Sequence, residues 1–305
     1  MKKRVLITGA NGLLGQKLVQ LLTEDPLYDL IATGRGENRL PQKEGYTYLS
    51  LDITKKSQVE EVVSTLNPDF IIHTAAMTNV DQCEVDKEAC RQQNVDAVNY
   101  LVEAAKKAKS FLIHLSTDFI FDGEDGPYDE SANAKPLSYY GETKLASEKI
   151  VTKSKIKWAI VRTVLVFGIA HDMSRSNIVL WVKKNLEEKK EIQVVNDQFR
   201  SPTLAEDLAM GCYLIMESEA TGIFNISGKE ILTPYDMAIK TADFFNLDKS
   251  LITKSDSTKF KQIAVRPLKT GFLIDKAIDK LGYDPHTFEE GIRLMSEQMG
   301  ENVAG

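Results

Sequence analysis

The chain has 305 residues, of which 43% are hydrophobic and 27% are charged, and its formal net charge is −6. This composition is typical of a folded globular protein and excludes a fibrous or wholly disordered chain. Because acidic and basic residues are mixed without a long basic block, we expect no nucleic-acid partner.

The N-terminus begins with basic residues, but the apolar run that follows is too short for a secretory signal. No apolar stretch approaches the ~20 residues that would cross a membrane. The three cysteines, Cys83, Cys90 and Cys212, have no metal-ligand spacing and suit a reducing compartment. We therefore expect a cytoplasmic protein with no membrane partner and no metal site.

In the first half of the chain, short apolar runs alternate with amphipathic segments. The apolar runs predict strands at residues 5–7, 30–32, 46–51, 70–72, 111–113 and 158–161. The segments between them predict helices at residues 16–22, 58–66 and 95–105. This alternation favours an α/β fold, a doubly wound parallel sheet of the Rossmann type with helices on both faces.

Beyond Gly168 the pattern loosens. It predicts a helix at 177–188, strands at 192–195 and 223–226, a helix at 203–216 and a mostly helical tail from residue 234. We expect a dinucleotide-binding domain over residues 1–168, to which residues 203–227 return. Residues 169–202 and 228–305 would then form a smaller, discontinuous C-terminal substrate lobe.

A glycine-rich turn follows the first predicted strand and opens the first helix. Glycines in the spacing G-x-x-G-x-x-G allow a tight turn and let backbone amides approach a pyrophosphate at the helix N-terminus. The context of strand, turn and helix predicts dinucleotide binding rather than an ordinary turn. The residues expected to bind the cofactor here are Gly9, Asn11, Gly12, Leu13, Leu14 and Gly15.

The end of the second predicted strand carries Arg35 in the sequence Thr-Gly-Arg-Gly. Folds that bind NAD place an acidic residue there, whereas an arginine suits the 2′-phosphate of NADPH. NADPH is therefore the expected cofactor, with NADH as the alternative and a solvated loop arginine as the competing reading. Asp52 and Ile53 follow at the end of the third strand and are also expected to bind the cofactor. Asp52 would contact the adenine, and the alternative is that it caps the next helix.

Candidate catalytic residues follow the fifth predicted strand. Thr117 ends that strand, where ligands bind in open α/β sheets. Tyr140 and Lys144 are spaced i, i+4 and share a helical face, so the lysine is expected to lower the tyrosine pKa from about 10. A chance match is the alternative, because lysine is common in this chain. His73 and His114 are predicted to be core residues.

These motifs resemble the extended short-chain dehydrogenases/reductases nearly from end to end. The matching segments are residues 9–15, 75–81, 116–123, 140–148, 162–163, 196–203 and 266–267. The resemblance implies that Thr117, Tyr140 and Lys144 are catalytic, with Lys144 also holding the nicotinamide ribose. It also implies that Ala75 and Ala76 lie beside the nicotinamide and that Met77 binds the cofactor.

Residues 196–203 and 266–267 carry a narrower similarity, to the family's reductases of nucleotide-linked 4-keto deoxysugars. It implies NADPH-dependent reduction of such a sugar, bound by Val80, Asp118, Phe119, Leu165, Arg200 and Arg266. Structural ion pairs are the alternative role of the two arginines.

Two positions depart from the patterns of the family. Phe119 stands where the family's dehydratases carry a glutamate base, so dehydration is not expected. Leu165 stands at or next to the place of a tryptophan that usually walls the pocket of these reductases.

Two other functions stay open at this point. One is an epimerase or a reductase of a different ketone, and the other is a non-catalytic, cofactor-binding regulatory subunit. The expected partner is a small-molecule nucleotide sugar, with a homodimer as one option for assembly.

Overall fold

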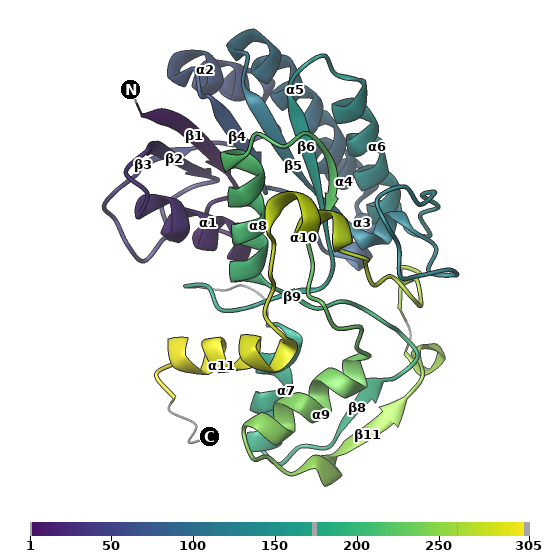
Figure 1. Cartoon of the computed structure of the whole chain (residues 1–305). Helices are drawn as coiled ribbons and strands as arrows, with labels where there is room; N and C mark the ends of the chain where they lie inside the picture. The colour runs from purple at the N-terminus through teal and green to yellow at the C-terminus, as the bar shows by residue number, and fades with distance from the viewer. Residues whose placement is uncertain (1, 173–175, 261, 302–305) are drawn as a thin grey trace.

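Seven parallel strands form the centre of the protein, whose computed structural model describes residues 2–172, 176–260 and 262–301 (Figure 1). Their order is β10-β6-β5-β4-β1-β2-β3, and every neighbouring pair is parallel. The strands are β1 (Lys3–Thr8), β2 (Tyr28–Gly34), β3 (Thr47–Ser50), β4 (Phe70–His73), β5 (Phe111–Thr117), β6 (Trp158–Thr163) and β10 (Gly222–Asn225). The predicted doubly wound Rossmann sheet is confirmed.

Helices cover both faces of this sheet. One face packs against α1 (Leu13–Thr23), α8 (Ala205–Glu217) and α10 (Asp275–Leu281). The other packs against α2 (Lys56–Leu66), α5 (Ala97–Ala108) and α6 (Tyr139–Lys153). Within β1, Val5 and Ile7 point to the first face and Leu6 to the second, and all three are fully buried. Burial on both faces is why the strands appear as continuous apolar runs in the sequence.

The direction of winding reverses between β1 and β4, which are neighbours in the sheet although β2 and β3 separate them in the chain. In open α/β sheets such a switch point opens a crevice at the carboxyl ends of the strands. The segment after β4 leads into α3 (Val80–Val85), α4 (Lys87–Arg91) and a π-helical turn, Gln92–Asp96, that continues into α5.

A smaller lobe lies below the carboxyl ends of the strands in Figure 1. It contains α7 (Ile178–Glu187), α9 (Pro234–Phe244), α11 (Phe288–Gln298) and a two-stranded sheet of β8 (Ile192–Val195) and β11 (Ile252–Ser255). A second strand pair, β7 (Val166–Phe167) with β9 (Thr203–Leu204), lies where the chain passes between the two parts. The lobe has apolar clusters of its own, centred on Phe167 and on Val182.

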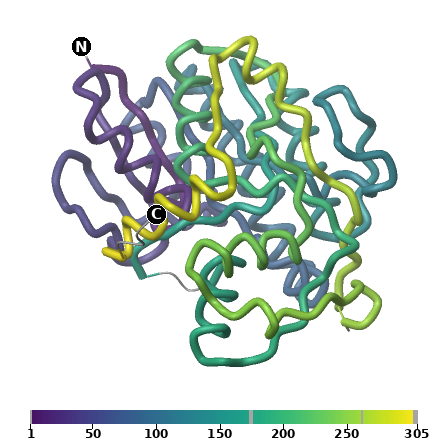
Figure 2. The backbone as a smooth tube through the Cα atoms, turned by 60° about the horizontal axis from the view of Figure 1, so that its bottom comes forward, coloured from purple at the N-terminus to yellow at the C-terminus, as the bar shows by residue number. Residues whose placement is uncertain are grey.

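Strand β11 was not expected in a tail predicted to be mostly helical. It is only four residues long, and its partner β8 is 60 residues earlier in the chain. No local periodicity in the sequence therefore indicates this strand. The C-terminal chain, yellow in Figure 2, then returns to α1, where Gln298 accepts a hydrogen bond from Lys17.

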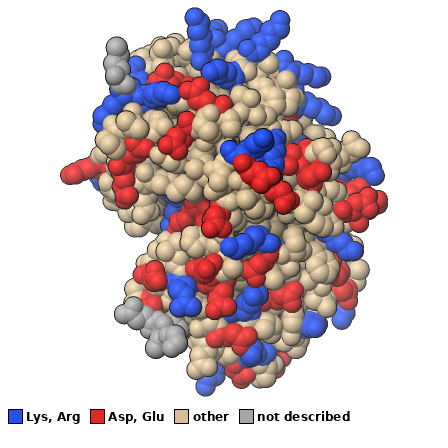
Figure 3. Space-filling view, viewed as in Figure 1, with Lys and Arg blue, Asp and Glu red and all other residues tan. Residues whose placement is uncertain are grey.

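Acidic and basic side chains are interspersed over both parts of the face shown in Figure 3. His73 and His114 are buried and their rings stack, which confirms their prediction as core residues. Within residues 2–172, 176–260 and 262–301, no helix combines the length and apolar character needed to cross a membrane.

Candidate active site

The glycine turn joins the end of β1 to the start of α1. Gly9 has a φ of +73°, and a Cβ on it would lie 2.7 Å from the backbone nitrogen of Ala75. A Cβ on Gly15 would lie 2.3 Å from the Gly9 carbonyl oxygen. Gly12 is the N-cap of α1, and no side chain in the described part of the protein caps the helix. The turn therefore needs glycine for its backbone, and the helix start is left open toward the cavity described next.

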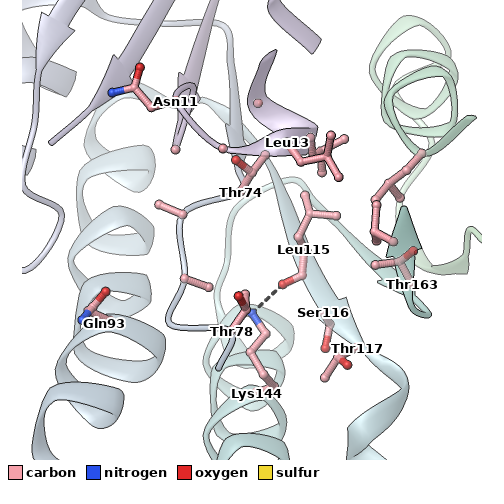
Figure 4. A pocket seen from close by; sticks show the side chains of 18 of the residues that line it. Asn11, Leu13, Thr74, Thr78, Gln93, Leu115, Ser116, Thr117, Lys144 and Thr163 are labelled. Atoms are coloured by element: carbon pink, nitrogen blue, oxygen red, sulfur yellow. Dashed lines mark hydrogen bonds between the residues drawn. The ribbon is translucent and has the colours of Figure 1, made fainter. Parts of the chain in front are cut away.

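A cavity of about 700 Å³ extends along the carboxyl ends of the strands from this turn to α6 (Figure 4). Most of the predicted site residues line it: Gly9, Asn11, Gly12, Leu13, Leu14, Gly15, Arg35, Ile53, Ala75, Ala76, Val80, Thr117, Asp118, Phe119, Tyr140, Lys144 and Leu165. Four predicted site residues are not part of the lining: Asp52, Met77, Arg200 and Arg266.

Two arginines lie at the end of the cavity beside β2. Arg35 was predicted, but Arg39 was missed because it sits in an irregular loop whose folding no spacing reveals. Asn11 fixes that loop: its Oδ1 accepts the Arg39 amide at 3.0 Å, and its Nδ2 donates to the Tyr48 hydroxyl at 3.0 Å. The glycine turn thus organises the loop that carries both guanidinium groups.

Asp52 does not cap α2, and that alternative is wrong. The helix begins at Lys56 with Lys55 as its N-cap, while Asp52 Oδ1 accepts hydrogen bonds from the amide and hydroxyl of Thr54 at 3.0 and 2.7 Å. Burial alone would raise the pKa of the Asp52 carboxyl, but these two bonds lower it overall. Its neighbour Ile53 lines the cavity, and an adenine contact by Asp52 itself stays a prediction.

Thr117, Tyr140 and Lys144 come together at the other end of the cavity. Thr117 is the last residue of β5, and the other two lie in the first two turns of α6, which Ser138 caps through the Gly141 amide. Lys144 Nζ donates to the Leu115 carbonyl at 2.6 Å, the dashed line in Figure 4. The Thr117 hydroxyl lies near the Tyr140 phenol and donates its proton to Asp118 Oδ1 at 3.0 Å.

Burial shifts the pKa values of both α6 residues. It lowers the pKa of Lys144 to about 8, and it raises the pKa of Tyr140 despite the opposing effect of the nearby Thr117 hydroxyl. The predicted lowering of the Tyr140 pKa by Lys144 is therefore wrong, because removing the phenol from water outweighs it. Both groups are held in their neutral forms more strongly than in water, and the proton stays on the tyrosine near neutral pH.

Asn94 does not line the cavity but supports it, and the sequence analysis missed it. It is buried in the π-helical turn before α5, and its amide exchanges hydrogen bonds with the backbone of Met77 at 2.8 and 3.0 Å. It also donates to the Thr143 hydroxyl on α6 at 3.2 Å. The segment after β4 is thereby tied to the helix of Tyr140. A buried amide within an apolar helix pattern is the signal that could have identified it.

Two buried hydroxyls line the cavity without a hydrogen-bond partner among the described residues. They belong to Ser116, on β5, and Thr163, on the neighbouring strand β6. Buried polar groups are normally hydrogen-bonded, and leaving one unpaired costs about 1–3 kcal/mol. A polar ligand in the cavity would satisfy both.

Leu165 lines the cavity. Its φ of +36° is unusual for a residue with a side chain, and the residue is 42% exposed. The backbone there is held by the Thr203 amide, which donates to the Leu165 carbonyl at 3.2 Å. Phe119 supplies a second apolar surface, with its ring edge-on to that of Tyr140 at 5.8 Å between centroids.

The two predicted substrate arginines both lie in ion pairs. Arg266 makes a two-point contact with the Asp81 carboxylate at 3.1 and 2.7 Å, and this bond lowers the pKa of Asp81. Arg200 is buried, with its Nε 3.9 Å from Asp118 Oδ2. Both arginines therefore make the structural ion pairs that were the alternative to substrate binding. A direct contact of either one with a substrate stays a prediction.

Comparison with known proteins places this geometry in a family. The RmlD substrate binding domain family matches residues 2–300. A dTDP-4-dehydrorhamnose reductase of Aggregatibacter actinomycetemcomitans is 30% identical over 302 residues, which cover 95% of this chain and 97% of the relative. The beta subunit of methionine adenosyltransferase 2 of Bos taurus is 32% identical over 253 residues, covering 81% and 74%.

A solved structure is similar over the whole chain. The crystal structure of dTDP-4-dehydrorhamnose reductase from Bacillus anthracis in complex with NADP has a TM-score of 0.86 and 29% sequence identity. The match covers 98% of this chain and 100% of that one.

Proposed function

The chain belongs to the RmlD substrate binding domain family, and from that premise we propose that it is an NADPH-dependent reductase of a nucleotide-linked 4-keto deoxysugar. The proposed substrate is dTDP-4-dehydrorhamnose, the compound named for the reductases of Aggregatibacter actinomycetemcomitans and Bacillus anthracis. One observation carries the proposal: a single cavity holds both a dinucleotide cradle and the set Thr117, Tyr140 and Lys144.

The residues of the cavity fit NADPH. Gly9, Gly12 and Gly15 line the cavity at the uncapped start of α1, where backbone amides would hold a pyrophosphate. Arg35 and Arg39 would bind the 2′-phosphate with charge-assisted hydrogen bonds. Ala75 and Ala76 would lie beside the nicotinamide, where the unpaired Ser116 and Thr163 hydroxyls could receive polar groups.

NADPH, when bound, supplies a hydride for the carbonyl carbon. As negative charge gathers on the carbonyl oxygen, Tyr140 donates its proton to that oxygen, and Thr117 is placed to give it a second hydrogen bond. The raised pKa of Tyr140 keeps its proton available for donation near neutral pH. Lys144, fixed by the Leu115 carbonyl, would hold the ribose and offset the phenolate that remains.

The sugar and its diphosphate would lie between the sheet and the C-terminal lobe. We take the lobe as residues 169–202 and 228–305, of which 173–175, 261 and 302–305 lie outside the described residues. Within the second range, α10 packs on the sheet. Val80, Phe119 and Leu165 would contact the sugar. Arg266 keeps 22% of its side chain exposed and could turn from Asp81 to a phosphate, whereas Arg200 is almost fully enclosed. Arg266 is therefore the better placed of the two for direct contact.

A second candidate is a cofactor-binding regulatory subunit. The similarity to the beta subunit of methionine adenosyltransferase 2 favours it, since that similarity covers 81% of this chain. The assembled Thr117, Tyr140 and Lys144 favour the reductase instead, because binding alone does not require a proton donor.

Purified protein and NADPH should be mixed with dTDP-4-dehydrorhamnose, with other 4-keto sugar nucleotides and with simple aliphatic ketones, and the loss of NADPH absorbance followed. The proposal predicts that the sugar nucleotide is turned over fastest. Tight NADPH binding without turnover of any ketone would favour the regulatory subunit, and faster turnover of simple ketones would exclude the nucleotide-sugar substrate.

A further inference from the structure

The Asp118 carboxyl links the catalytic strand to the C-terminal lobe. It is only 2% exposed, directly after Thr117. Its Oδ1 accepts the Thr117 hydroxyl at 3.0 Å. Its Oδ2 accepts the Thr270 hydroxyl and lies 3.9 Å from Arg200 Nε. One carboxyl group therefore contacts the catalytic hydroxyl with one oxygen and two side chains of the lobe with the other.

The lobe holds these two partners in place through its backbone. Arg200 donates to the carbonyls of Pro267 at 2.6 Å and Leu268 at 3.0 Å. The Thr270 amide donates to the Phe199 carbonyl at 3.0 Å. Thr270 is fully buried and does not line the cavity. Its hydroxyl therefore reaches the reaction only through Asp118.

The Thr117 hydroxyl has one proton to give. In the structure the proton goes to Asp118 Oδ1, while the Thr117 oxygen accepts the Phe119 amide at 3.2 Å. To hydrogen-bond a substrate oxygen, Thr117 must turn this proton away from the carboxylate. The carboxylate competes less strongly for it when other groups offset its charge. Here these are the Thr270 hydroxyl, which donates to Oδ2, and the Arg200 guanidinium, whose Nε lies 3.9 Å from the same oxygen.

We propose that Asp118 and Thr270 are positioning residues that control whether the Thr117 hydroxyl turns toward the substrate oxygen. The lobe thereby acts on proton transfer as well as on substrate binding. This role rests on the proposed reductase function, and it assigns Asp118 an indirect part in place of the direct substrate contact implied by resemblance. The competing view is that Thr270 only donates a hydrogen bond to the buried Asp118 carboxylate and has no effect on catalysis.

The Thr270→Val variant keeps the shape of the side chain and removes the hydroxyl. We expect kcat with dTDP-4-dehydrorhamnose to fall about tenfold, the loss that corresponds to one hydrogen bond made in the transition state. KM and the NADPH dissociation constant should change less than about threefold, since Thr270 touches neither ligand. Thr270→Ser should restore most of kcat.

Thr241→Val is the matched control. Thr241 is also a fully buried threonine of the lobe, but among the described residues its hydroxyl donates only to the Met237 carbonyl of its own helix, at 2.7 Å. This variant should keep the kcat of the parent. Equal kcat values for the two valine variants, or no rescue by serine, would overturn the proposal.

Thermal unfolding of single and double variants, measured without substrate, tests the Asp118 link independently of the reductase function. The Tm losses of Thr117→Val and Thr270→Val should not add in the double variant, because both bonds end on Asp118. Those of Thr117→Val and Thr241→Val should add. Additive losses in both pairs would contradict the link even if the parent proves inactive on sugars, whereas an inactive parent with coupled losses would refute only the reductase function.

Discussion

The two sides of the cavity are built in different ways. On the cofactor side, the turn at 9–15 is a continuous piece of chain, and Tyr140 and Lys144 lie one helical turn apart. On the lobe side, Asp81 meets Arg266 across 185 residues, and Asp118 meets Thr270 across 152. The cofactor side is thus fixed mainly by local backbone geometry, and the substrate side by charged contacts between distant segments.

This difference predicts how each side responds to change. Substitutions on the cofactor side should remove chemistry or cofactor affinity while leaving the rest of the cavity in place. Substitutions on the lobe side should instead change how the sugar binds. They should affect catalysis only indirectly, through other residues. The predictions below test this contrast, beginning with the largest expected effect.

Tyr140→Phe should remove most of the activity while cofactor binding persists. The loss of a general acid typically costs 10²–10⁴-fold in rate. Tyr139→Phe is the matched control, since Tyr139 lies on the same helix and does not line the cavity. Steady-state rates and NADPH titrations on both variants make the measurement. If Tyr139→Phe were the more damaged enzyme, the proton donor would be misassigned.

Lys144 should make the folded protein more stable as pH rises. Its folded pKa of about 8 lies below the ordinary value of 10.5, so between these values the unfolded chain binds more protons and stability increases with pH. Below pH about 8 both states are protonated and this gain is absent. Over the full window the gain is about 3 kcal/mol, at 1.36 kcal/mol per pKa unit.

Urea unfolding of the parent and of Lys144→Met at about pH 7 and about pH 10 measures this effect. The rise should be larger in the parent than in the methionine variant. Parallel pH dependences in the two proteins would show that burial does not depress the Lys144 pKa.

Arg35→Ala should weaken NADPH binding about tenfold, the loss of one charge-assisted contact, and leave NADH binding nearly unchanged. Arg293→Ala, an exposed arginine on α11, is the control and should affect neither cofactor. Dissociation constants come from nicotinamide fluorescence. Equal affinities of the parent for NADPH and NADH would exclude a 2′-phosphate site at Arg35.

Leu165→Trp should have the smallest effect, because it places a larger side chain at a partly exposed position of the cavity and leaves the proton donor unchanged. We expect a decrease of about threefold in KM for the sugar nucleotide, from extra apolar contact, with kcat kept within about twofold. Steady-state kinetics with both substrates varied distinguish the two constants. A large decrease in kcat would mean that catalysis depends on the backbone conformation at Leu165, whose φ is +36°.

The sequence predicted the sheet well, because strands such as β1 and β4 are buried on both faces and appear as continuous apolar runs. It predicted the glycine turn and the Tyr140–Lys144 helix for the same reason, since each is a local pattern. Strand β11 could not be predicted, because its stability depends on a partner 60 residues away.

Site residues outside such patterns were harder to identify. Arg39 lies in a loop that Asn11 shapes, and Asn94 acts through the backbone of Met77, so neither has a characteristic spacing. The pKa of Tyr140 was predicted in the wrong direction, since the sequence shows a neighbouring lysine but not the depth of burial. Thr270 has no motif at all, and only its hydrogen bond to Asp118 draws attention to it.

The most direct test of the central claim is isotope transfer. Purified protein is incubated with dTDP-4-dehydrorhamnose and NADPH in which both hydrogens at C4 of the nicotinamide are deuterium, and the sugar nucleotide is analysed by mass spectrometry. The account predicts a reduced sugar nucleotide one mass unit heavier than the product formed with ordinary NADPH, and at least about 100-fold less of it from Tyr140→Phe at equal times. Recovery of unreduced sugar under conditions where NADPH is bound would contradict it.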